Sequence, residues 1–152
     1  MSRLIYLIQV WGGCSGYLIG CLQLLQNRAA RAVTRLEFST PVKTLLLQCG
    51  WLSVNQLVYF HTLILTFNIR KHKQPLFLSK KLSNDFGRLT RLALSDGIRR
   101  MDRNKLSVTQ ASFRVRATKY WNSLPTDIRQ CSKIGNFKVK VKAWIKANVS
   151  VY

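Results

Sequence analysis

With 152 residues, the chain has the length of one domain rather than several. Hydrophobic residues make up 47% of it, which is enough for a packed core, whereas 25 lysines and arginines against 5 aspartates and glutamates give a formal net charge of +20. Because like charges repel one another in a compact fold, this excess indicates a polyanionic partner. Nucleic acid is the first candidate, and an anionic membrane surface is the rival.

The N-terminal stretch MSRLIYLIQVWGGCSG places Arg3 before an apolar run and then small residues, as a short secretory signal does. The run Leu4–Val10 is short, however, it contains Gln9, and no small-residue cleavage site follows it. We therefore expect a short strand over Leu4–Trp11 and keep secretion as the alternative. The later apolar run Leu57–Ile69 is too short to cross a bilayer, which takes about 20 residues, so we expect an intracellular protein of the cytoplasm or nucleus.

Residues 17–36 show the apolar period of a helix. The apolar side chains that share one stripe are Leu18, Leu22, Leu25, Ala29, Ala32, Val33 and Leu36. A stripe of this kind is typical of a helix that packs one face against a core. Arg28, Arg31 and Arg35 form a row on its flank, where all three can face water or phosphate.

A short helix is expected after Thr40, which can cap its start, with Pro41 in the first helical position. Gly50 suits its end. Trp51 then begins a short link to the next helix.

Ser53 followed by Gln56 has the spacing of a capping box. The helix that it begins runs from Val54 to about Ile69 and is apolar on nearly every side, which is typical of a helix in the middle of a bundle. His61 inside it is expected to be a hydrogen-bonded core residue rather than a ligand or a base.

Residues 70–111 are basic and polar, with a short helix expected near Pro75–Leu82 and turn signals at Asn84-Asp85 and Asp96-Gly97. We predict a long basic loop, a kind of segment that in compact domains is usually functional or disordered. Its candidate phosphate contacts are Arg99, Arg100 and Arg103.

The stretch SFRVRATKYWNSLPTDIR predicts a helix, because Phe113, Ala117, Tyr120 and Leu124 share one face with Trp121 at its edge. Pro125 ends this helix and serves as the first position of another short one, in which Asp127 is favourable near the N-terminus.

A last helix is expected after a cap at Asn136. The residues expected to face inward are Phe137, Val141, Trp144 and Ile145. Lys138, Lys142 and Lys146 step along the helix four residues apart and make a second basic row. Trp121 and Trp144 could stack on bases, but their place on inward faces favours core packing.

Residues for catalysis are missing from the pattern. The acidic residues stand singly, so the paired carboxylates of a two-metal site are absent, and no phosphate-binding glycine motif occurs. The four cysteines form no C-x-x-C pair and lie far in sequence from either histidine, which indicates free thiols rather than a zinc site. We expect no catalytic residue, no metal, no cofactor and no small-molecule substrate.

Five segments occur in an order that resembles the C-terminal part of the reverse transcriptases of non-LTR retrotransposons, the jockey-like LINE class. They are IQVWGG, LQNRAARAVT, LLLQCGWLSVNQL, SFRVRATKYWNSLPTDIR and FKVKVKAWI. The resemblance covers nearly the whole chain and implies the end of the thumb and a helical post-polymerase segment, which hold template RNA and primer DNA. It also implies that the catalytic palm, fingers and endonuclease lie upstream, so no catalytic aspartate has a counterpart here.

The sequence thus predicts a mainly α fold, a small irregular helical bundle with a short N-terminal strand and a long basic loop. It would be one domain, a fragment of a larger polymerase, with the end of a thumb strand at 1–13, a helical core at 16–69, the basic loop at 70–111 and C-terminal helices at 112–149.

Our first hypothesis is that the chain binds the RNA or DNA backbone, without catalytic activity of its own and with the polymerase domains as a further candidate partner. The candidate contacts are Arg28, Arg31, Arg35, Arg99, Arg100, Arg103, Lys138, Lys142 and Lys146. A retroelement relic without a function, and a small basic secreted or membrane-surface protein, are the alternatives. Apolar surface that would pack on a polymerase is expected to be bare, which predicts poor solubility.

Overall fold

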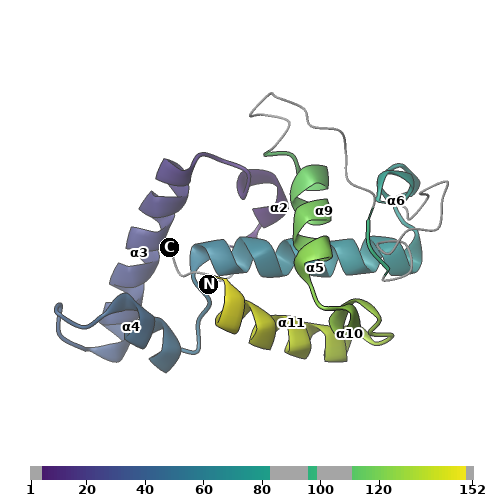
Figure 1. Cartoon of the computed structure of the whole chain (residues 1–152). Helices are drawn as coiled ribbons and strands as arrows, with labels where there is room; N and C mark the ends of the chain where they lie inside the picture. Colours follow the sequence, from purple (N-terminus) through teal and green to yellow (C-terminus); the bar gives the residue numbers. More distant parts are fainter. Residues whose placement is uncertain (1–4, 83–95, 99–110, 150–152) are drawn as a thin grey trace. The chain divides into compact units, whose positions relative to one another are not determined.

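The structure is a computed structural model that describes residues 5–82, 96–98 and 111–149. Within those ranges it is mainly helical, as predicted, and contains no strand. The helices are, in chain order, α2 (Ile8–Trp11), α3 (Gly16–Thr34), α4 (Val42–Gln48), α5 (Val54–His72), α6 (Leu76–Lys81), α9 (Phe113–Ser123), α10 (Thr126–Arg129) and α11 (Ile134–Asn148) (Figure 1).

The residues gather into two compact units. The first unit comprises Met1–Val58 and Trp144–Tyr152, and the second comprises Tyr59–Ala143. The boundary runs through α5 and α11, so each of these helices contributes one end to each unit. The expectation of one domain stays a prediction.

The predicted N-terminal strand is wrong for the described part of the segment, which forms the short helix α2. Its backbone finds partners nearby: the Val10 and Trp11 amides donate to the Leu7 carbonyl at 2.8 and 3.2 Å. The Trp11 indole N–H donates to the Tyr6 carbonyl at 2.9 Å. A strand needs a neighbouring strand to satisfy these groups, whereas a helical turn satisfies them locally.

Helix α3 covers most of the predicted range 17–36, but it ends at Thr34, and Arg35 is its C-cap with a left-handed φ of 53°. The face that it buries is not the predicted one. Its buried residues are Gln23, Gln26, Asn27 and Ala30. On the apolar stripe, Leu18 is 50% exposed, Leu25 57% and Val33 66%. The stripe therefore faces away from the interior of the first unit, and the polar face takes its place.

Two glutamines explain the orientation of α3, because their amides bind the backbone that leads into α5. The Gln23 amide N–H groups donate to Gln26 Oε1 at 3.0 Å and to Asn27 Oδ1 at 2.8 Å, while Gln23 Oε1 accepts from the Val54 amide at 2.8 Å. Gln26 Nε2 donates to the Leu52 carbonyl at 2.8 Å. Buried amides are retained where their hydrogen bonds are made, and here each finds partners.

The predicted end of α4 at Gly50 is confirmed, whereas its start is shifted by one residue. Gly50 has φ +66°, the left-handed conformation that glycine favours at a helix end, and the Trp51 amide donates to the Leu46 carbonyl at 2.9 Å. The start of α4 differs, since Val42 is its first residue and Pro41 is the N-cap.

The predicted capping box at the start of α5 is also confirmed. The Gln56 amide donates to Ser53 Oγ at 3.3 Å, and the Ser53 amide donates to Gln56 Oε1 at 3.1 Å. At its other end α5 continues three residues beyond Ile69, to His72, so the predicted basic loop 70–111 begins within a helix. The predicted short helix near Pro75–Leu82 is present as α6.

The second unit has an aromatic core. The rings of Phe67 on α5 and Phe137 on α11 stack with centroids 4.4 Å apart, and Trp121 on α9 lies 5.8 Å from Phe137. Around them lie the other buried apolar residues of this unit, which are Leu63, Ile69, Leu82, Ile98, Ala117, Leu124, Ile128 and Val141. Helices α5, α9 and α11 thus meet in one packed interior.

The predicted break at Pro125 is confirmed, because α9 ends at Ser123 and α10 begins after Pro125, whose carbonyl accepts from the Arg129 amide at 3.2 Å. Pro125 is the N-cap of α10 and not its first helical residue, which is Thr126. The predicted cap at Asn136 is wrong. Helix α11 begins two residues earlier, at Ile134, so Asn136 lies inside its first turn and is exposed.

Candidate nucleic-acid interface

The lysine row of α11, which comprises Lys138, Lys142 and Lys146, lies on the surface as predicted. Each of these lysines directly follows a fully buried apolar residue in the sequence. These buried residues are Phe137, Val141 and Ile145. With a rise of about 1.5 Å per residue, successive lysines lie about 6 Å apart along the helix, so the row borders the buried stripe over about 12 Å. The packing of α11 therefore fixes which way the row faces.

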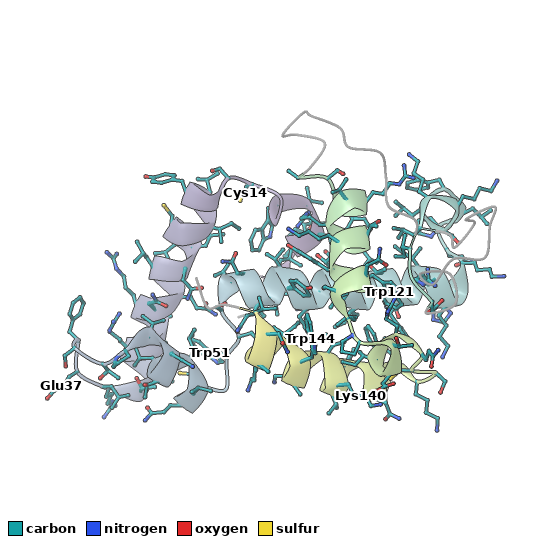
Figure 2. All side chains as sticks on the ribbon, in the orientation of Figure 1. Cys14, Glu37, Trp51, Trp121, Lys140 and Trp144 are labelled. Atoms are coloured by element: carbon teal, nitrogen blue, oxygen red, sulfur yellow. The ribbon has the colours of Figure 1, made fainter. Side chains whose placement is uncertain are left out.

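The rest of α11 adds positive charge and no negative charge. Its sequence, IGNFKVKVKAWIKAN, contains no acidic residue. Lys140 is also exposed and extends outward from the helix (Figure 2), and Lys133 precedes the first turn on the surface. A helix with only basic charges on its surface suits a polyanionic backbone.

The pKa of His61 on α5 depends in part on this surface, because one of its lysines lies nearby. Partial burial lowers the pKa of its imidazole, and the nearby Lys138 ammonium lowers the pKa further. The imidazole is therefore held more strongly in its neutral form than an exposed histidine. His61 is half-buried, and its ring lies edge-on to the Phe60 ring with centroids 5.4 Å apart; that it is a hydrogen-bonded core residue stays a prediction.

The arginine row of α3 is only partly available. Arg28 and Arg35 are exposed. The Arg31 guanidinium instead lies 4.7 Å from the Phe38 ring centroid, and its Nη2 donates to the Phe38 carbonyl at 3.4 Å. The three arginines are therefore not equally exposed, because Arg31 is half-buried against the Phe38 ring; that all three contact phosphate together stays a prediction.

The third predicted group, Arg99, Arg100 and Arg103, lies outside the described residues. Its neighbour Ile98 is fully buried and held on both sides of its backbone: the Ile98 amide donates to Asn122 Oδ1 and Asn122 Nδ2 donates to the Ile98 carbonyl, both at 2.8 Å. No sequence motif indicates this role for Asn122. It anchors the chain to α9 directly before the three arginines.

The prediction that Trp121 and Trp144 pack inward is confirmed fully for Trp121 and partly for Trp144. Trp121 is 1% exposed, and its indole N–H donates to the Asp96 carbonyl at 2.8 Å (Figure 2). It is therefore a packing residue and not a platform for bases. Trp144 is half-buried on α11.

Arg70 was predicted to belong to the basic stretch 70–111, and no role was predicted for Arg129, but both contact the interior of the second unit. Arg70 is half-buried there, and Arg129 is buried, as Arg116 is. Arg70 forms an ion pair with Asp96, donates through Nη1 to the Leu82 carbonyl at 3.1 Å, and lies 5.0 Å from the Trp121 ring. Arg129 is 8% exposed, and its Nη2 approaches Thr126 Oγ1 at 3.5 Å.

Burial is the main cause that lowers the pKa of both guanidinium groups, Arg70 and Arg129, and Asp96 partly opposes it. Both remain cations, since an arginine in a protein does not lose its proton at neutral pH. Their contacts are internal to the second unit, so they support its structure and are not counted among the phosphate contacts.

The described residues hold no group of three side chains suited to a metal ion, and all four cysteines are free thiols. In the part of the chain that the structure describes, none of the helices has both the length and the apolar character to traverse a membrane. Comparisons of the chain with models of known protein families, with curated proteins and with solved structures gave no match.

Proposed function

We propose that this protein binds the phosphate backbone of nucleic acid through the lysine row of α11, without reading base sequence. The observation that carries the proposal is the placement of Lys138, Lys142 and Lys146 on one surface of a helix whose other face is locked into a core. Lysine side chains on a rigid helix act as point charges for phosphate oxygens, and such contacts position a protein on a strand without specifying a sequence.

Arg28 and Arg35 are the additional contacts offered by α3, and Arg99, Arg100 and Arg103 remain candidates from the predicted basic loop. The resemblance to the C-terminal region of non-LTR reverse transcriptases suggests the natural ligand, which would be template RNA paired with primer DNA. In that setting the bond-making residues belong to a polymerase palm, and this chain contributes affinity for the strands.

The test is the salt dependence of binding to a fluorescent RNA–DNA hybrid of mixed sequence. About six phosphate contacts predict that log Kd changes with log salt concentration with a slope of magnitude about 5. Replacing the row, K138Q/K142Q/K146Q, should reduce this magnitude by about 2 to 3, since each phosphate contact contributes about 0.7 to 0.9.

A matched control removes the same charge elsewhere. Lys43, Lys80 and Lys81 are all exposed, and none lies on α11. The variant K43Q/K80Q/K81Q should keep most of the wild-type slope. Equal losses in the two variants would mean that binding follows net charge alone, and the proposed row would then have no special role.

Anionic lipid vesicles provide the comparison with the rival partner. If the row serves nucleic acid, the hybrid should displace the protein from vesicles of mixed neutral and anionic lipid at physiological salt. Retention on the vesicles in the presence of excess hybrid would favour the membrane-surface alternative.

A further inference from the structure

The apolar face of α3 is a second surface, and it is separate from the lysine row. We define the α3 seam as Leu18, Leu22, Leu25, Ala29 and Ala32. Leu18 and Leu25 are 50% and 57% exposed, both alanines are exposed and Leu22 is half-buried. Contiguous apolar surface of this kind on a helix commonly marks a site of association.

The seam faces away from the interior of the first unit because another face of α3 is tied to that unit. Gln26 is 2% exposed and binds the Leu52 carbonyl, and Gln23 is 7% exposed and binds the Val54 amide. Rotating α3 to bury the seam would break these long-range hydrogen bonds and strand the buried polar groups that make them. These hydrogen bonds thus keep the seam out of the interior of the first unit.

The spacing of the seam identifies the shape of its partner. Its residues follow one another at intervals of four, three, four and three, which is the repeat of a coiled-coil contact line. Ala29 and Ala32 have small side chains, so a facing helix can approach closely at that end. Over the 19 residues of α3 the helix is about 28 Å long, enough for two such repeats.

The charge beside the seam identifies the chemistry of its partner. Arg28 lies in a flanking position that faces a partner helix in such a repeat, the exposed Arg35 follows directly as the C-cap of α3, and α3 contains no acidic residue. A second copy of this chain would bring a net charge of +20 against +20, and an antiparallel pair would set arginine against arginine. A helix with acidic flanks would set carboxylates there instead.

We propose that the α3 seam is the docking face for an amphipathic helix whose apolar stripe repeats every 3.5 residues and whose flanks carry aspartate or glutamate. The leucines of the partner pack between Leu18, Leu22 and Leu25, and its carboxylates pair with Arg28 on the flank of α3, with the exposed Arg35 adding positive charge at the end of the helix. This surface does not depend on the proposed nucleic-acid binding, because the lysine row of α11 takes no part in it.

The probe is a pair of synthetic helical peptides with the same leucine repeat, one with glutamate and one with lysine in the flanking positions. The glutamate peptide should bind the full-length protein at least about tenfold more tightly, as measured by fluorescence anisotropy at physiological salt. Equal binding of both peptides, or no binding of the glutamate peptide, overturns the proposal.

Variants locate the site. L18Q/L25Q should weaken binding of the glutamate peptide by about tenfold or more, since two leucines lose their burial in the complex. The control L76Q/V139Q replaces two similarly exposed residues, 69% and 71%, on other helices and should change binding by less than about twofold. Far-UV circular dichroism shows that the variants stay folded, which is expected because these side chains are exposed.

Sedimentation of the peptide-free protein tests whether a second copy of the chain occupies the α3 seam. A monomer at all concentrations agrees with a seam reserved for an acidic helix. A dimer that L18Q/L25Q abolishes and L76Q/V139Q leaves intact would mean that a second copy occupies the seam, and the proposal would be wrong. K138Q/K142Q/K146Q should bind the glutamate peptide normally, which separates this result from that of the nucleic-acid test.

Discussion

Helices α3 and α11 have the same kind of sequence, an apolar stripe with a basic row beside it, yet they use it in opposite ways. In α11 the apolar side chains Phe137, Val141 and Ile145 are fully buried and the lysines face outward. In α3 a glutamine-rich face is buried and the leucines are exposed. The comparison shows that the helical period of the apolar residues identifies an apolar stripe. It does not determine whether the fold buries that stripe or another side of the helix. Hydrogen bonds from residues far apart in sequence decide that, here Gln23 and Gln26 with the segment around Leu52.

The largest expected effect on stability comes from comparing Phe137 with Leu25, since the sequence predicted that both belong to the apolar stripe of their helix. Phe137→Ala should lower the free energy of unfolding by about 3 to 5 kcal/mol, because it removes a fully buried ring that stacks on Phe67. Leu25→Ala should change it by no more than about 0.5 kcal/mol, since Leu25 is 57% exposed. Urea denaturation measures both, and similar losses in the two variants would contradict the orientation of α3.

Breaking the hydrogen bonds of Gln23 and Gln26 that orient α3 should cause a smaller loss in the free energy of unfolding. Gln26→Leu keeps the size of the side chain but leaves the Leu52 carbonyl and one Gln23 N–H without their partner, at a cost of about 1 to 3 kcal/mol. Gln48→Leu on α4, where the side chain is exposed, is the control and should be nearly neutral. A stabilising effect of Gln26→Leu would mean that the buried amides are not what holds α3.

The capping box offers a smaller effect still. Ser53→Ala removes the hydroxyl that accepts from the Gln56 amide and should cost about 1 kcal/mol in the free energy of unfolding. Ser53→Thr should restore much of this loss, since threonine supplies a neutral hydroxyl cap and Ser53 is fully buried. If alanine and threonine behaved alike, the hydrogen bond at the start of α5 would not contribute to stability.

The smallest effect concerns pH. Because burial and Lys138 lower the folded-state pKa of His61, the unfolded chain binds a proton more readily, and this histidine should make the protein less stable as pH falls below its ordinary pKa of about 6.5. The loss levels off once pH is below the folded-state pKa. His61→Gln should remove this part of the dependence, and Lys138→Gln should reduce it; a dependence unchanged by either substitution would contradict the assignment.

Local signals in the sequence predicted local structure well. Ser53 with Gln56, Gly50 and the break at Pro125 each act through neighbours within a few residues, and the structure confirms all three. The inward and outward faces of α11 also followed from its period. These features depend on backbone geometry and short-range hydrogen bonds, which the sequence states directly.

Two kinds of feature were not predicted. The apolar run Leu4–Trp11 indicated a strand, whereas the described backbone forms local hydrogen bonds in a helical turn. The role of Arg70 depends on a distant segment, because its ion-pair partner Asp96 lies 26 residues away in sequence. Of the candidate phosphate contacts, the lysine row and two of the three α3 arginines are exposed as predicted.

The most direct measurement of the proposed interface is the pKa of His61, followed by NMR in the protein alone and bound to an RNA–DNA hybrid. If phosphates lie against Lys138, they neutralise the ammonium that lowers this pKa, so the pKa of His61 should rise on binding. The same rise should appear in the unbound Lys138→Gln variant. Saturating binding that leaves the pKa of His61 unchanged would place the nucleic acid elsewhere and contradict the proposed role of α11.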